Sequence, residues 1–139
     1  MFRFIALISL LVSFSVSADQ TCPSNFQEFL IKFQNNDEFQ NTQRRYPLTY
    51  SYVDELAEPE AKVIEVSVSF EQAAQMKVEL GYPTEEKVKS VPFIRKISKQ
   101  SKNIMSVQFY KDDTDYVITY FFNYSKNCWW LFKVINGSL

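Results

Sequence analysis

The 139-residue chain contains no histidine, only two cysteines and only two glycines. Without histidine or a Cys-x-x-Cys pair it has no ordinary zinc site, and we expect neither a metal nor a cofactor. The scarcity of glycine, with 46% hydrophobic and 17% aromatic residues, argues against disorder and sequence repeats. The formal net charge is only -1, so no strong excess of one sign favours nucleic acid or an anionic membrane as the main partner.

We also expect no lasting membrane anchor, because the only long apolar run is too short and is followed by polar sequence. Arg3 gives this run a cationic start; the run begins at Phe4 and ends in small residues at Ala18. That pattern is typical of a secretory signal peptide cleaved after Ala18. We therefore predict a leader over residues 1–18, one domain over residues 19–139, and a periplasmic or secreted location.

The two cysteines lie near opposite ends of the predicted mature chain, at Cys22 and Cys128. In an oxidising compartment, an even number of cysteines favours an intramolecular disulfide. The alternative is a pair of thiols that binds a metal or acts in redox chemistry. We predict the Cys22–Cys128 disulfide, because the spacing of a metal or redox motif is missing.

Two helices are expected at the start of this domain. The first spans residues 24–33, with a cap at Ser24, because its apolar residues fall on one helical stripe. The stripe comprises Phe26, Phe29, Leu30 and Phe33. The second spans residues 38–44 with Asp37 as its cap, and Pro47 prevents its extension.

The remaining sequence predicts mainly strands. Alternating apolar residues indicate strands over residues 46–52 and 64–70, joined by an acidic turn, and helix-forming residues over 71–80 precede Gly81 as a helix C-cap. A connector with two prolines follows. Strands at 105–109, 116–124 and 128–135 then form a three-stranded antiparallel meander. We predict an α+β fold in which N-terminal helices pack on a strongly curved antiparallel sheet, giving a cone.

The order of elements and several local motifs resemble the nuclear-transport-factor-2-like (NTF2-like) superfamily. The motifs are Phe26-x-x-Phe29-x-x-x-Phe33, then Asp37-x-Phe39-Gln40-x-x-x-Arg44-Arg45-x-Pro47-Leu48, and the final Trp130-x-Phe132-x-Val134. Within the superfamily, the chain is most similar to the bacterial exported domain-of-unknown-function family 4348. The resemblance implies helices closing one side of a curved sheet around a pocket, and a homodimer through the sheet face.

Aromatic and basic residues are the candidate binding groups. Tyrosine offers a ring for packing and a hydroxyl for a ligand, and an arginine fork suits a carboxylate, for example that of a cell-wall peptide. Tyr packing in the core, and an ion pair of the arginines with Glu28 or Glu38, are the structural alternatives. Two adjacent tryptophans must point to opposite faces of their strand, so at most one faces the core. The candidates are Arg44, Arg45, Tyr46, Tyr50, Tyr52, Tyr116, Tyr120, Trp129 and Trp130.

We consider three functions. The first is an exported, non-catalytic binding module that recognises a small apolar ligand or a protein through an aromatic-lined concave sheet. A more specific version is a periplasmic immunity or inhibitor protein that neutralises a toxic enzyme. The third is an isomerase-like or dehydratase-like enzyme, which needs a buried acid such as Asp37 beside a tyrosine donor. We predict the first, because no catalytic set is recognisable.

Overall fold

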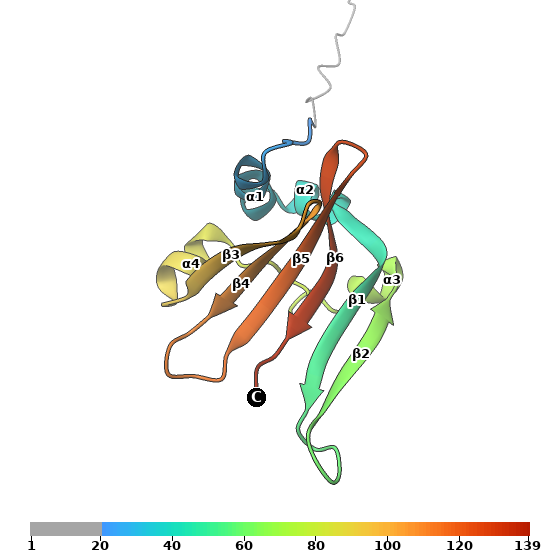
Figure 1. Ribbon diagram of the computed structural model, residues 1–139, viewed down its shortest axis with the longest axis vertical. Coiled ribbons are helices and arrows are strands. Elements are labelled where there is room, and N and C mark those ends of the chain that lie inside the picture. Colours follow the sequence, from blue (N-terminus) through green and yellow to red (C-terminus); the bar gives the residue numbers. More distant parts are fainter. Residues whose placement is uncertain (1–20) are drawn as a thin grey trace, which may run out of the picture.

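A curved six-stranded sheet with strand order β2-β1-β6-β5-β4-β3 organises the chain (Figure 1). The structure, a computed structural model, describes residues 21–139, so the predicted leader and its cleavage point lie outside the described residues. The helices are α1 (Phe26–Asn35), α2 (Asp37–Thr42), α3 (Phe70–Ala73) and α4 (Glu85–Ser90). The strands are β1 (Arg44–Asp54), β2 (Lys62–Val68), β3 (Ile94–Ser101), β4 (Ile104–Tyr110), β5 (Val117–Ser125) and β6 (Cys128–Asn136).

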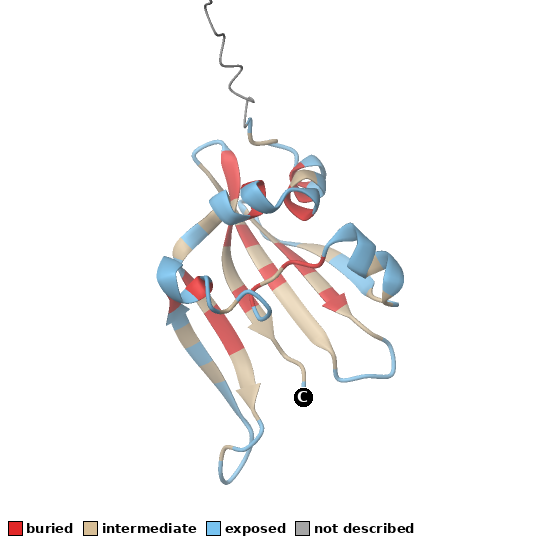
Figure 2. Cartoon of the chain, turned by 180° about the vertical axis from the view of Figure 1, so that it is seen from behind, coloured by how far each residue is buried: buried red, intermediate tan, exposed pale blue. Residues whose placement is uncertain are grey.

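The helices and the connection between α3 and α4 lie on one face of the sheet, and the other face is left bare (Figures 1 and 2). The predicted α+β class, with helices packed on a curved sheet, is confirmed. Within residues 21–139, no helix has both the length and the apolar character needed to cross a bilayer.

Both N-terminal helices form where predicted, but their caps were assigned one residue off. Asn25, not Ser24, caps α1, because its Oδ1 accepts hydrogen bonds from the backbone of Gln27 and Glu28 at 2.9 and 3.1 Å. Asn36 caps α2 in the same way, and Asp37 is the first helical residue. Asn is as good a cap as the neighbouring Ser24 or Asp37, so residue type alone did not decide the position.

The segment 71–80 is not the predicted helix. A capping box between Ser69 and Gln72 starts α3, but the helix ends at Ala73. Between Phe70 and Leu80 only Ala73 and Leu80 are buried, so there is no apolar face to hold a longer helix against the sheet, and helix propensity alone is too weak. Gly81 is therefore not a helix C-cap. It allows a tight approach, since a Cβ there would meet the Lys77 carbonyl oxygen at 2.7 Å.

The predicted connector after Gly81 contains two further elements. Thr84 caps the short helix α4, and β3 follows it as the edge strand of the sheet. The predicted meander β4-β5-β6 is confirmed, and β3 extends it to four antiparallel strands. The turn between β5 and β6 is tight, with Lys126 and Asn127 both at positive φ, as expected of a two-residue hairpin turn.

One strand pair departs from the expected antiparallel sheet. β1 pairs with β2 antiparallel, as predicted, but it runs parallel to β6 on its other side. The second predicted strand was placed two residues late, because Phe70 begins α3 instead of ending β2. The parallel pair joins the N-terminal hairpin to the C-terminal meander.

The core is aromatic and lies between the sheet and α1. Phe122 is fully buried at its centre, and the rings of Phe26, Phe29 and Phe33 lie 5.3–5.6 Å from it between centroids. Tyr82, from the α3–α4 connection, covers the same cluster at 6.3 Å from Phe122. The stripe predicted for the first helix is thus the face that packs on the sheet.

Candidate ligand-binding cleft

The predicted tyrosines divide between core and periphery. Tyr50 and Tyr120 are buried, with 5% and 1% of their surface exposed, so the packing interpretation holds for both. Tyr52 is half-buried and stacks on Tyr50 at 5.7 Å. Tyr46 packs edge-on against Phe70 at 5.5 Å, on the same inner face of β1. These tyrosines of β1 therefore share one face, as predicted, but among them only Tyr46 borders a cleft.

Tyr116 lies at the other side of the sheet. Its ring is 5.1 Å from that of Phe93, and the Lys111 ammonium lies 5.3 and 5.2 Å from the two ring centroids. A hollow of about 490 Å³ adjoins it, lined by residues of the 111–117 segment, by the C-terminal residues, and by Lys96, Gln108 and Tyr110 of β3 and β4. No ion pair with a described residue holds either of its two cations, Lys96 and Lys111, in place.

The two tryptophans lie on opposite faces of β6, as predicted. Trp129 packs against α1, 4.8 Å from the ring of Phe26, and its Nε1 donates to the Ser24 carbonyl at 3.0 Å. Trp130 faces outward, where the Arg45 guanidinium lies 5.9 Å from its ring. Trp129 is therefore a core residue, and Trp130 with Arg45 belongs to the bare face.

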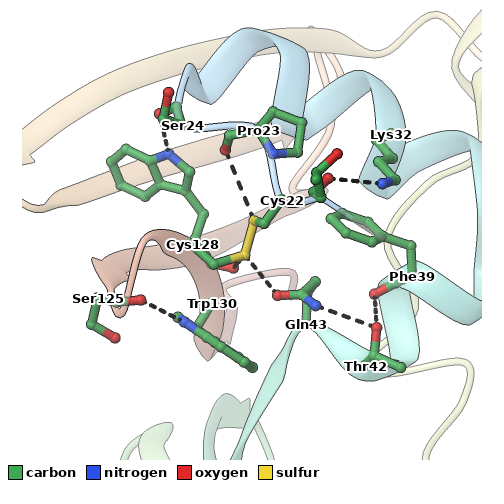
Figure 3. Close-up of a disulfide and its surroundings, with 12 residues drawn as sticks. Cys22, Pro23, Ser24, Lys32, Phe39, Thr42, Gln43, Ser125, Cys128 and Trp130 are labelled. Carbon is green, nitrogen blue, oxygen red and sulfur yellow. Dashed lines mark hydrogen bonds between the residues drawn. A yellow bond between two sulfur atoms is a disulfide. The ribbon is translucent and has the colours of Figure 1, made fainter. Parts of the chain in front are cut away.

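The predicted disulfide is confirmed. Cys22 and Cys128 are bonded, with their Cα atoms 5.4 Å apart (Figure 3). The bond fastens the segment before α1 to the start of β6, close to Gln43 at the end of α2. It fits an oxidising compartment.

Arg44 is the residue around which a cleft is built. Its Nη2 donates to Gln40 Oε1 at 2.9 Å and to the Leu80 carbonyl at 3.2 Å. Gln40 is itself buried, and its Nε2 donates to the Phe33 carbonyl at 3.3 Å. This chain of bonds from α1 through α2 to the α3–α4 connection fixes the guanidinium in place. The alternative considered from the sequence, an ion pair with Glu28 or Glu38, is not formed, and no acid within residues 21–139 forms an ion pair with Arg44.

The guanidinium keeps unused donors. Nε is buried without a partner, and no described residue accepts from Nη1, which is not buried. Beside it, burial raises the pKa of Tyr120 well above its ordinary value, so this hydroxyl stays protonated and donates to the Gly81 carbonyl at 2.6 Å. Arg44 is therefore a fixed cation with free N–H groups.

Two adjoining clefts open beside Arg44, with volumes of about 190 and 300 Å³. The smaller one has an apolar wall of Tyr46, Phe70 and alanines of α3, and the larger one is polar. Asn41, Arg44 and Lys77 border both. The smaller cleft is lined by Asn41, Arg44, Tyr46, Phe70, Ala73, Ala74 and Lys77, and the larger by Asp37, Gln40, Asn41, Arg44, Lys77 and Gly81.

Carboxyl groups around the sheet are exposed or half-buried, and none in residues 21–139 is buried. Asp37, the candidate acid, borders the larger cleft at an exposed position. Where acids have perturbed pKa values, hydrogen bonds lower them: to Lys133 for Glu65, to its own backbone and Ser69 for Glu71, and to Lys89 for Glu85. Such shifts favour the ionised form, which is the opposite of what a general acid needs.

Sequence reasoning found Arg44 and Tyr46 but missed Asn41, Phe70 and Lys77. Phe70 had been placed on a strand and Lys77 in a long helix, so neither was expected beside Arg44. No local signal marks them, because Asn41 comes from α2, Phe70 from the start of α3 and Lys77 from the chain after α3, and only the tertiary fold brings them together.

Comparison with solved structures places this architecture among known folds. An NTF2-like protein from Bacteroides fragilis superposes with a TM-score of 0.58 at 16% identity, over 83% of this chain and 47% of that one. The chain has the NTF2-like fold. It spans about half the length of the Bacteroides fragilis protein.

Two further structures show weaker likeness to this NTF2-like chain. An NTF2-like protein of unknown function from Silicibacter pomeroyi gives a TM-score of 0.38 at 12% identity, over 80% of this chain and 87% of that one. A de novo designed pocket protein gives 0.37 at 10% identity, over 79% and 92%. No family model and no curated protein sequence matches, so the narrower likeness to family 4348 stays a prediction.

Proposed function

We propose that this chain is an exported, non-catalytic binding module that holds a small carboxylate-bearing ligand in the cleft beside Arg44. The observation that carries the proposal is the fixed guanidinium with free donors and no acid partner among the described residues. A carboxylate in the cleft would accept from the accessible Nη1, and charge-assisted bonds of this kind are strong and directional.

The shape of the site supports a ligand with an apolar part. The ring of Tyr46 and the exposed ring of Phe70 form one wall of the smaller cleft, next to the charge of Arg44. Lys77, which also borders both clefts, adds a second cation. Small-molecule sites commonly combine an apolar lining with a few fixed polar groups, and these volumes lie at or below the lower end of their range.

Two further observations favour binding in an exported setting over catalysis. The disulfide and the apolar N-terminal run both suit an oxidising compartment outside the cytoplasm. The acids of residues 21–139 lack the burial that raises a carboxyl pKa for proton transfer. We also propose that the chain belongs to family 4348, because the motif from Asp37 to Leu48 that resembles this family supplies Asp37, Gln40 and Arg44 to the lining of the larger cleft.

The test is a titration followed by amide chemical shifts, with benzoate as the probe and neutral benzamide as its isostere. Benzoate should shift the amides around Arg44 and Lys77, and benzamide should not. Arg44→Gln should weaken benzoate binding by about tenfold to a hundredfold, since hydrogen bonds to charged groups contribute about 1.5–3 kcal/mol. Lys77→Gln, at an exposed position, should weaken it less and leave the fold intact.

Arg45→Gln is the matched control, because Arg45 is the next residue on β1 and faces the bare side of the sheet. It should bind benzoate like the unchanged protein. Equal binding of benzamide and benzoate, or equal losses from Arg44→Gln and Arg45→Gln, would contradict the proposal.

A further inference from the structure

Charge is strongly segregated along the sheet although the whole chain is nearly neutral. Between Glu86 and Asp112 the sequence has no acid and seven basic residues. These are Lys87, Lys89, Arg95, Lys96, Lys99, Lys102 and Lys111. They belong to α4, to the edge strand β3, to the β3–β4 turn and to the residue that follows β4. The acidic turn between β1 and β2 lies at the opposite edge.

These cations are largely unpaired. Within residues 21–139 only Lys89 of this group forms an ion pair, with Glu85 at 2.6 Å. Arg95, Lys96 and Lys99 lie on β3 itself and are all exposed. Alternation along the strand puts Arg95 and Lys99 on the side of the helices and Lys96 on the bare side. Positive charge therefore flanks the strand on both sides.

The edge of β3 also offers backbone groups. β3 pairs only with β4, over eight residues from Ile94 to Ser101. No backbone hydrogen bond from the described chain reaches its outer side. On the bare face, a polar hollow of about 260 Å³ runs beside Lys96 and Ser98.

Lysines on an edge strand commonly prevent pairing with other chains. That explanation accounts for one or two charges on β3, but not for the four cations outside the strand. The other edge strand, β2, carries the oppositely charged Lys62 and Glu65 and has no comparable cluster. These cations would repel a basic strand, would offer a neutral strand no attraction, and would attract an acidic strand. The edge is therefore selective for an acidic partner strand.

We propose that the β3 edge binds an extended acidic peptide segment of a partner protein, which adds to the sheet as a further strand. Main-chain hydrogen bonds along β3 would hold the segment, and acidic side chains on both of its faces would meet Arg95, Lys96 and Lys99. A peptide suits this edge better than a sulfated polysaccharide or a nucleic acid, because only a peptide pairs in register with a free strand. This site is separate from the Arg44 cleft.

The probe is an acetylated and amidated octapeptide with the repeat Glu-Glu-Val-Val, which places glutamates on both faces of an extended strand, titrated at low and high salt. Binding should slow hydrogen exchange at the outward amides of β3 and should weaken as salt rises. The same peptide with every backbone nitrogen methylated keeps its charge but donates no backbone hydrogen bond, so it should bind at least about tenfold more weakly.

Charge reversal tests the electrostatic part. Lys96→Glu and Lys99→Glu, both at exposed positions, should each weaken the octapeptide by several-fold, and together by about tenfold or more. Lys62→Glu, an exposed cation on the other edge strand, is the matched control and should bind normally. Circular dichroism confirms that each variant is folded.

Three results would overturn the proposal. One is equal affinity for the methylated peptide; another is a heparin fragment that binds as tightly as the octapeptide without protecting β3 amides. The third is a Lys62→Glu loss as large as that of Lys99→Glu.

Discussion

Replacing either of two neighbouring buried tyrosines by phenylalanine should change the free energy of unfolding, but in opposite directions. Tyr82 and Tyr120 have ring centroids 4.9 Å apart, and both are at most 4% exposed. The Tyr120 hydroxyl donates to the Gly81 carbonyl, whereas the buried Tyr82 hydroxyl has only the Arg95 guanidinium near it and forms no hydrogen bond of good geometry with a described residue. Replacing each by phenylalanine removes one oxygen atom and leaves the ring packing in place.

The signs follow from hydrogen bonding. Tyr120→Phe should lower the free energy of unfolding by about 0.5–1.5 kcal/mol, the net contribution of an ordinary hydrogen bond. Tyr82→Phe removes a desolvated hydroxyl that forms no hydrogen bond of good geometry in return, so the free energy of unfolding should stay unchanged or rise by up to about 1 kcal/mol. In urea, the two midpoints should differ by roughly 0.5–1 M.

Alkaline pH adds an independent readout. Burial raises the pKa of Tyr82, and the positive charge of Arg95 opposes this only in part; burial also raises the pKa of Tyr120. Both groups are neutral below pH 10 in either state, so their contribution is complete there. Above pH 10 the unfolded chain ionises and the native one does not, so stability falls by about 1.4 kcal/mol per tyrosine at pH 11.

Each phenylalanine variant lacks one ionisable hydroxyl, so its loss of stability between pH 8 and pH 11 should be smaller by the contribution of one tyrosine. Urea unfolding at pH 8 and pH 11 measures both effects with the same samples. Equal destabilisation by the two substitutions at pH 8 would refute the hydrogen-bond assignment. An unchanged alkaline loss in both variants would refute the burial argument.

Two other perturbations test the core and the disulfide. Phe122→Ala should cost about 3–5 kcal/mol, because the ring is fully buried, whereas Phe121→Ala, on the opposite face and half-buried, should cost far less in the same urea assay; similar losses would mean that the core side of β5 is misassigned. Reducing the Cys22–Cys128 bond, which closes a sequence separation of 106 residues, should lower stability by up to about 4–5 kcal/mol and the melting temperature by several degrees. An unchanged melting curve, with both thiols free to titrate before reduction, would contradict the disulfide.

Strong periodicity explains which parts of the fold were predictable. The aromatic stripe of α1 and the alternation in β4 both reflect burial against one shared core, so the pattern in the sequence is the pattern in the structure. The helix predicted over residues 71–80 was wrong because these residues favour helix individually, while too few of them bury a side chain. β3 was missed because an exposed, lysine-rich edge strand has almost no apolar alternation to detect.

The candidate cleft was only half predictable, for a related reason. Arg44 and Tyr46 stand out as a charged and an aromatic residue two positions apart in the sequence, but Phe70 and Lys77 join them only through the placement of α3 and the chain after it, which no local pattern specifies. Pairing across the sheet is equally hidden, because the alternation in β1 does not say which strand will lie beside it or in which direction.

The parallel contact between the first strand and the last has a consequence for how the molecule forms. Until residues near position 134 are available, Tyr50 has no neighbour on that side, and the early hairpin stays apart from the later four strands. The side-chain bond from Trp129 to Ser24 and the sulfur bridge span the same long separation. Folding of the complete sheet should therefore be slow, because it requires contacts between residues at nearly opposite ends of the chain. A chain that stops short of β6 should yield two unconnected fragments of sheet.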